Sequence, residues 1–183
     1  MPRDRSAPAP LVYAFRVRLR GSVDEEGNRS EDVWREIEVA ASQTLADLGE
    51  AIPLAFDFTD PHLWSFFMSG KAWDESTEYA LQRDPDTLGG GRSRLAKRVR
   101  IDELPLPGKT GRKEFLYLFD YGDEWHFRVE LLRVTDAVDP GAIYPRVVAQ
   151  QGEAPPQYEY DEDEEDEEDD EENDEEVGEK TDD

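Results

Sequence analysis

Cysteine is absent from this 183-residue sequence, which excludes disulfide bonds and thiolate metal sites. Histidine is nearly as scarce, since only His62 and His126 could serve as imidazole bases or metal ligands. No run approaches the roughly 18 consecutive apolar residues of a membrane span, and residues 1–10 lack the apolar core of a signal peptide. We therefore expect a cytoplasmic protein without a membrane segment, and nothing in the sequence predicts a cofactor.

Charge of one sign dominates the C-terminus. Residues 159–183 contain 19 acidic residues and one lysine, whereas residues 1–158 contain 27 acidic and 20 basic residues, for a formal net charge of −25 overall. So acidic a segment, with almost nothing to bury, is typical of disorder. We divide the chain into a disordered N-terminus (1–10), one folded domain (11–158) and a disordered acidic tail (159–183). Tyr158 and Tyr160, at the start of the tail, are positioned to dock locally.

The most strongly patterned stretch, residues 115–134, predicts a β-hairpin. Between 115 and 119 aromatic residues alternate with leucines, so both faces are apolar and the strand should be covered on both sides. Gly122 is expected to supply the positive φ of a tight turn at 120–123. The second strand alternates apolar Trp125 and Phe127 with polar His126 and Arg128, which predicts a half-buried strand whose polar face meets solvent or a site.

The remaining pattern predicts three more strands and one helix. Residues 11–19 and 33–39 should pair as a hairpin with a long loop, and residues 62–68 form a third, very aromatic strand. A helix begins near Thr44, where Asp47 stands at capping-box spacing, and Pro53 should kink or break it. Residues 71–100 read as a long polar connection, 101–104 as a short helical turn, and 139–158 as a segment that wraps the surface.

This order of elements predicts an α+β fold. We expect a single mixed β-sheet of about five strands with one main helix packed on one face, resembling a β-grasp roll.

Several short motifs together resemble a known family over roughly residues 11–158. The motifs are Trp34-Arg35, Thr44-Leu45-Ala46-Asp47-Leu48, Ala55-Phe56 with His62-Leu63, the segment 117–126 (Tyr-Leu-Phe-Asp-Tyr-Gly-Asp-Glu-Trp-His), Tyr144-Pro145-Arg146 and the segment 152–156 (Gly-Glu-Ala-Pro-Pro). They are similar to those of the plasmid pRiA4b ORF-3-like proteins, some of which are carried as passengers in transposons.

The resemblance implies a small α+β domain associated with mobile elements, with no established activity to carry over. Many members have cysteines near the closing segment, and any metal role of those residues cannot apply here because this sequence has none. Transposon members have been labelled resolvases, but this sequence has no serine-recombinase arrangement.

Both histidines and two aspartates of the hairpin turn are candidates for chemistry. If the third strand neighbours the hairpin, His62, Asp120, Asp123 and His126 could converge as an acid–base site, with His62, His126 and Asp123 as metal ligands. In the plainer interpretation the aspartates stabilise the turn, His126 lies on a polar face and His62 ends a loop. The sequence contains no nucleophile–base pair, phosphate-binding glycine loop or complete metal signature, so it does not establish an enzyme.

A second candidate site is a basic segment before the hairpin. Arg92, Arg94, Lys97, Arg98 and Arg100 place five cations within nine residues. They could form a solvated loop, bind the acidic tail internally or contact nucleic acid. The negative charge of both the domain and the tail opposes contact with phosphates.

The function that fits these features best is a non-enzymatic binding or accessory domain. Its partner would be a protein, and the acidic tail favours a basic one. A metal-dependent or acid–base enzyme using the His/Asp residues and a DNA-binding accessory protein using residues 92–100 remain the alternatives.

Overall fold

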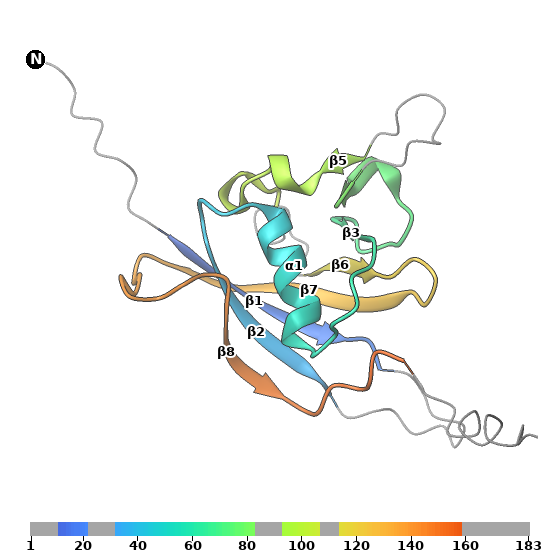
Figure 1. Ribbon diagram of the computed structural model, residues 1–183. Helices are drawn as coiled ribbons and strands as arrows, with labels where there is room; N and C mark the ends of the chain where they lie inside the picture. The colour runs from blue at the N-terminus through green and yellow to red at the C-terminus, as the bar shows by residue number, and fades with distance from the viewer. Residues whose placement is uncertain (1–10, 22–31, 83–92, 107–113, 159–183) are drawn as a thin grey trace, which may run out of the picture.

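The computed structural model describes residues 11–21, 32–82, 93–106 and 114–158. Within these residues one mixed sheet of eight strands is crossed on one face by a single α-helix, so the fold is α+β as predicted (Figure 1). The strand order in the sheet is β5-β4-β3-β6-β7-β1-β2-β8. The predicted disorder of residues 1–10 and of the acidic tail concerns segments outside the described residues.

The elements are β1 (Val12–Leu19), β2 (Trp34–Ala40), α1 (Leu45–Ala55), β3 (Trp64–Phe67), β4 (Glu78–Ala80), β5 (Arg94–Leu95), β6 (Glu114–Phe119), β7 (Trp125–Thr135) and β8 (Arg146–Gln151), with short 3-10 helices at Glu75–Thr77, Ala96–Arg98 and Ile101–Glu103.

The predicted count of about five strands was wrong, because three further strands extend the sheet at its two edges. The five predicted strands correspond to β1, β2, β3, β6 and β7. β4 and β5 lie inside the segment predicted to be a connection, and with three and two residues they are too short to show a period of two. β8 lies in the segment predicted to wrap the surface. It is an edge strand whose pairing with β2 contains a register shift, and its exposure does not alternate.

The pairing of the central strands follows the predicted hairpins. β1 pairs antiparallel with β2, and β6 pairs antiparallel with β7, with Phe119 opposite Trp125 beside the turn. β7 also pairs with β1, which joins the two hairpins at the middle of the sheet. The parallel pair β4–β5 makes the sheet mixed.

The N-terminus of α1 is capped as the sequence predicts. The Thr44 hydroxyl accepts a hydrogen bond from the backbone N–H of Asp47 at 3.3 Å, and the Asp47 carboxylate accepts one from the N–H of Thr44 at 2.6 Å. This reciprocal capping box satisfies two backbone donors that a helix start otherwise leaves free. No helix among the described residues is long and apolar enough to cross a membrane.

Pro53 does not break α1, which continues to Ala55. Proline has no N–H, so the carbonyl of Gly49, four residues earlier, has no helical donor. The buried hydroxyl of Tyr117 on β6 donates a hydrogen bond to that carbonyl at 2.8 Å. The helix therefore tolerates the proline because the sheet supplies the missing hydrogen bond.

Gly49 also sets how closely α1 approaches the sheet. A Cβ atom at this position would lie 2.4 Å from the indole ring of Trp64 on β3, far inside normal contact distance. Only the absence of a side chain at Gly49 allows the ring to fit beneath the helix. The core between helix and sheet is rich in aromatic rings, such as Phe56 of the helix end and Phe127 of β7, whose centroids are 4.9 Å apart.

The opposite face of the sheet is apolar only in part. Leu116 and Leu118 of β6 form a small buried cluster there with Phe67 of β3, against which Ala72 and Tyr121 pack. This confirms the prediction that the 115–119 strand is covered on both faces. Over β1, β2, β7 and β8 the same face instead carries ion pairs.

The hairpin turn differs from the prediction, because Gly122 has no positive φ. The positive φ values belong to Asp120 (57°) and Glu124 (53°). The Asp120 carboxylate accepts a hydrogen bond from the Gly122 N–H at 2.9 Å, and the Asp120 carbonyl accepts one from the Glu124 N–H at 2.7 Å. Aspartate tolerates the left-handed conformation better than most residues because its side chain bonds locally in this way.

Candidate functional site

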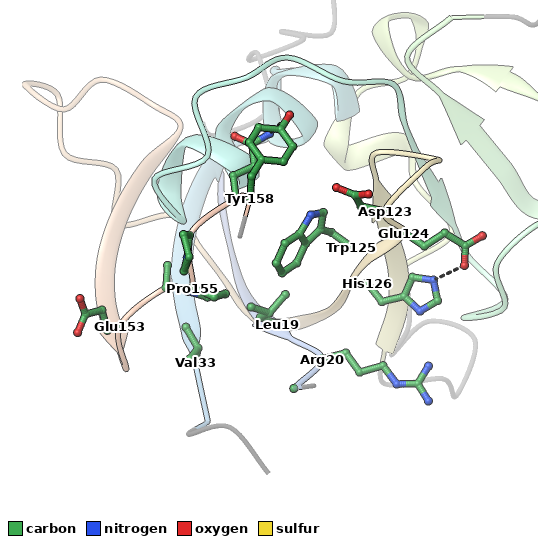
Figure 2. Close-up of a pocket in the computed structure, with 14 residues that line it drawn as sticks. Leu19, Arg20, Val33, Asp123, Glu124, Trp125, His126, Glu153, Pro155 and Tyr158 are labelled. Atoms are coloured by element: carbon green, nitrogen blue, oxygen red, sulfur yellow. Dashed lines mark hydrogen bonds and ion pairs between the residues drawn. The ribbon is translucent and has the colours of Figure 1, made fainter. Parts of the chain in front are cut away.

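A cleft of about 1030 Å³ opens at the end of the sheet where β1 ends and β7 begins (Figure 2). One wall comes from Leu19 and Val33, at neighbouring strand ends, and the floor from Trp125, the first residue of β7. The opposite wall is the segment 153–158, which follows β8 and includes Pro155 and Pro156. Segments far apart in sequence therefore form one concave surface.

The wall formed by 153–158 is fixed to the loop before β3. The Gln157 side chain donates to the Asp60 carbonyl and accepts from the Asp60 N–H, both at 3.0 Å. The Tyr158 hydroxyl lies 2.6 Å from Nε2 of His62. The prediction that Tyr158 docks locally is thus confirmed, whereas Tyr160 lies outside the described residues.

Tyr158, His62 and Asp120 form a continuous chain of polar contacts. Nδ1 of His62 is 3.1 Å from one carboxylate oxygen of Asp120, whose other oxygen accepts from the turn N–H of Gly122. A carboxylate can only accept, so Nδ1 carries a proton, and when the imidazole holds that one proton its Nε2 accepts from the tyrosine hydroxyl. In this assignment an almost buried aspartate orients a histidine that contacts a hydroxyl lining the cleft.

The electrostatic environment keeps Tyr158 protonated at neutral pH. Partial burial raises its pKa, and the nearby carboxylates of Asp60, Asp120 and Asp123 raise the pKa further. The tyrosine is therefore a hydrogen-bond donor rather than an anionic nucleophile. The same three carboxylates make this end of the cleft electrically negative.

The four predicted residues do not meet in one cluster. The structure joins His62 to Asp120, while Asp123 and His126 line the cleft without a hydrogen bond or ion pair to either of them among the described residues. Within the same residues no group of three or more His, Asp or Glu side chains is arranged to hold a metal ion. Sequence reasoning did not place Tyr158 in contact with His62, and only its position at the start of the acidic tail indicated that it would dock on the domain.

Trp125 gives the cleft its apolar floor. Its indole packs edge-to-face on Phe58, with ring centroids 4.8 Å apart. The indole Nε1 is buried and has no hydrogen-bond partner among the described residues. The floor can therefore contact apolar groups and retains one unused donor.

The basic segment is only partly described, because Arg92 lies outside the described residues. The Arg100 guanidinium pairs with Asp102 at 2.6 Å, and the Arg94 guanidinium lies 5.3 Å from the ring centre of Tyr79. Lys97 and Arg98 are exposed and have no ion pair with another described residue. The cations of this segment therefore do not form one uniformly free basic surface.

Comparison with known proteins agrees with the fold and the motifs. The sequence model of the plasmid pRiA4b ORF-3-like protein family matches residues 12–176. The chain belongs to this family. Uncharacterized protein y4hQ of Sinorhizobium fredii (strain NBRC 101917 / NGR234) is 30% identical to the pRiA4b ORF-3-like chain over 146 residues, which are 80% of this chain and 67% of the relative.

A solved structure shares the fold. The crystal structure of protein of unknown function MM3350 from Methanosarcina mazei Go1 superposes with a TM-score of 0.61 and 24% sequence identity, covering 81% of the pRiA4b ORF-3-like chain and 73% of the other. At that identity the likeness establishes the architecture alone. Activity must be argued from the cleft itself.

Proposed function

We propose that this protein is a non-catalytic binding domain that holds a basic segment of a partner protein in the cleft between β1, β7 and residues 153–158. One observation carries the proposal: the cleft combines an apolar floor with a negative end, and one of its lining residues directly precedes the acidic run of the sequence. Tyr158 lines the cleft, and the next residue, Glu159, is the first of the 19 acidic residues in 159–183. Cleft and tail would therefore present negative charge to the same partner.

Charge complementarity favours a cationic occupant. Asp123 places a carboxylate at the end of the cleft near Tyr158, and Glu153 lines the other end with its carboxylate pointing outward (Figure 2). Arg20 is the cation among the lining residues, and its guanidinium points away from Trp125 and Pro155 in the same view. Lysine or arginine side chains would meet the carboxylates while an apolar group lies on Trp125.

The size of the cleft suits several side chains rather than one small molecule. Its volume of about 1030 Å³ lies at the upper end of the roughly 300–1,000 Å³ typical of small-molecule sites. Because the carboxylates are exposed, the attraction should weaken as salt screens it. A short peptide segment bound with marked salt dependence is the expected behaviour.

Selection of displayed random peptides against the full-length protein tests the proposal. Enriched peptides should carry Lys or Arg beside an apolar residue, and Asp123→Asn should weaken their binding about threefold to tenfold. Trp125→Ala should abolish binding. Matched controls are Trp73→Ala, since Trp73 is 51% exposed on the opposite face, and Asp139→Asn, an exposed acid outside the cleft. Acidic or neutral consensus peptides, or equal effects of Asp123→Asn and Asp139→Asn, would rule the proposal out.

Acid–base chemistry is the second candidate function, favoured by the chain from Asp120 through His62 to the Tyr158 hydroxyl. A histidine oriented by a carboxylate and bonded to a hydroxyl is the arrangement that proton transfer requires. Mass spectrometry of selected peptides after incubation with the full-length protein distinguishes the two functions. A covalent change that disappears in Tyr158→Phe and persists in the control Tyr144→Phe would establish catalysis. Peptides that are bound and recovered unchanged would leave binding as the function.

A further inference from the structure

A second cavity, of about 410 Å³, lies at the same end of the sheet on the face opposite Trp125. The starts of β6 and β7 and the loop at 70–72 enclose it. Its polar lining residues are Arg20, Lys71, Glu114, His126 and Arg128. We propose that this cavity binds a small ligand through an oxyanion group, a phosphate or a carboxylate.

The balance of charge is the first argument. Three of the polar lining residues, Arg20, Lys71 and Arg128, are cations, and Glu114 is the carboxylate among them. Glu114 lies 3.6 Å from Arg128, so it offsets one cation and leaves the cavity net positive. This gathering of positive charge is notable in a chain whose formal net charge is −25. Guanidinium and ammonium groups converging on one cavity are suited to phosphate or carboxylate oxygens.

His126 supplies the second, independent argument. Its Nε2 is buried and has no hydrogen-bond partner among the described residues. The neighbouring Glu124 carboxylate is 3.8 Å away, beyond hydrogen-bond distance, and its other oxygen accepts from the indole N–H of Trp73 at 3.1 Å. His126 lines the cavity, so a rotation of its ring that brings Nε2 to the cavity surface would let an oxyanion supply the partner that this nitrogen lacks.

The electrostatics at His126 place Arg20 close to it. Burial lowers the pKa of His126, Glu124 raises it, and the positive charge of Arg20 lowers it again. The imidazole is therefore neutral at pH 7 and can donate from one nitrogen without adding to the repulsion among the cations.

The cavity is built on rigid elements rather than on one loop. Leu116 of β6 gives the cavity a buried apolar side chain, while the neighbouring Phe115 points into the core on the other face of the sheet. Gly70, at φ 76°, donates its N–H to the Phe67 carbonyl at 3.0 Å and so closes the turn that presents Lys71. A volume of about 410 Å³ lies within the range of small-molecule sites, roughly 300–1,000 Å³, and leaves room for more than the anionic group.

Isothermal titration of the full-length protein at low ionic strength tests the site, with inorganic phosphate and acetate as separate probes. We expect phosphate or acetate to bind, and Lys71→Ala or Arg128→Ala to weaken binding about tenfold. Both side chains are exposed, so neither substitution threatens the fold. Lys97→Ala, which removes an exposed lysine elsewhere, is the matched control and should leave binding unchanged.

A gain of affinity provides the sharper measurement. Glu114→Gln removes the carboxylate that pairs with Arg128, so phosphate should bind about threefold to tenfold more tightly. Phosphate binding without acetate binding would identify a phosphate ester as the ligand class, acetate binding without phosphate binding would identify a carboxylate, and comparable binding would establish a site for either oxyanion. A full-length variant in which the acids of 159–183 are changed to their amides tests whether the chain's own carboxylates compete with the probes for the cavity. If they do, this variant binds the probes more tightly than the wild type.

The inference is overturned if neither probe binds to the wild type, Glu114→Gln or the amide variant when the probe is present at about 10 mM. A dissociation constant on that order is about the weakest affinity that would be useful. It is also overturned if Lys97→Ala weakens binding as much as Lys71→Ala. The outcome is independent of the cleft function, because Lys71→Ala should not alter peptide binding and Asp123→Asn should not alter phosphate binding.

Discussion

The two faces of the sheet are stabilised by different physical means. The face beneath α1 buries closely fitted aromatic rings, including Phe56, Trp64 and Phe127. The opposite face, over β1, β2, β7 and β8, carries ion pairs in which Arg133 contacts Glu36 and also Glu38 at 2.9 Å. One sheet can therefore obtain most of its stability from the apolar packing on one face, while its other face carries charged side chains.

The energy scales of these interactions differ accordingly. Aromatic pairs contribute roughly 0.5–1.5 kcal/mol beyond the burial of their area. Ion pairs at a surface contribute about 0–1 kcal/mol, and the pairs of Arg133 are compared with these because its side chain is 46% exposed, although Glu36 and Glu38 are buried. Substitutions that disturb the fit beneath α1 should therefore cost more than those that remove charge from the opposite face. The following predictions test this ordering, beginning with the largest effect.

Gly49→Ala should be the most destabilising of the substitutions considered. The new Cβ would overlap the Trp64 ring, which cannot retreat because it packs on Phe66 and Tyr117. An overlap this close should cost about 3–4 kcal/mol, at or above the top of the usual range for overpacking, so that after the helix-propensity gain of about 1 kcal/mol the net loss is roughly 2–3 kcal/mol. Urea denaturation measures it. Glu50→Ala, at an exposed position of the same helix, is the control, and equal effects of the two would contradict the close fit.

Tyr117→Phe should cost roughly 1–2 kcal/mol, because it leaves the buried carbonyl of Gly49 without a donor. Pro53→Ala restores a helical N–H to that carbonyl. In a double-mutant cycle followed by denaturation, Tyr117→Phe should therefore cost less in the Pro53→Ala background than in the wild type. Strictly additive effects would show that the tyrosine does not compensate for the proline.

On the charged face, Arg133→Gln should cost about 1 kcal/mol near neutral pH, since it leaves Glu36 and Glu38 without a shared partner. Arg128→Gln is the matched control, because Arg128 is more exposed and its one ion pair with a described residue is to the half-exposed Glu114 at 3.6 Å. It should change the free energy of unfolding by less than about 0.5 kcal/mol. If Arg133→Gln lowered the free energy of unfolding as much as Gly49→Ala does, the two faces would not differ in their contributions to stability.

The smallest expected effect is a pH dependence at His126. Burial lowers the pKa of His126, Glu124 raises it and Arg20 lowers it. The folded pKa therefore lies below the unfolded value of about 6.5. Its contribution to stability is therefore present above pH 6.5 and is lost as the pH falls below that value, where the unfolded chain takes up a proton first. His126→Gln should flatten the decline in stability between about pH 7 and 5. An unchanged or steeper slope would contradict the lowered pKa.

The sequence predicted those parts of the fold in which a periodic pattern or a local interaction decides the structure. Alternation located the central strands, and the spacing of Thr44 and Asp47 located the helix start. The sequence pattern did not predict the edge strands, because β5 has only two residues and β8 exposes Val147 and Val148 at successive positions. The hydrogen bond from Tyr117 to Gly49 spans 68 residues, so no local pattern could reveal it.

The candidate site was predicted only in part, for a similar reason. His62 and Asp120 meet because β3 neighbours β6, which was the condition stated for their convergence. His126 is separated from them by its place on β7, where it faces away from Trp125. Gly122 illustrates a different failure: the turn uses Asp120 in the left-handed conformation, because its side chain bonds to the very N–H of that glycine.

The adjacency of Trp125 and His126 has a consequence for how this family can vary. The two residues are consecutive on one strand, so their side chains point to opposite faces of the sheet: Trp125 into the cleft, and His126, which also lines the cleft, toward the second cavity. Inserting or deleting a single residue that shifted the register of β7 would exchange their environments, placing an imidazole on the apolar floor and an indole among the cations. A change of two residues would preserve both. The length of this hairpin should therefore vary between relatives in even steps, or be compensated by a bulge.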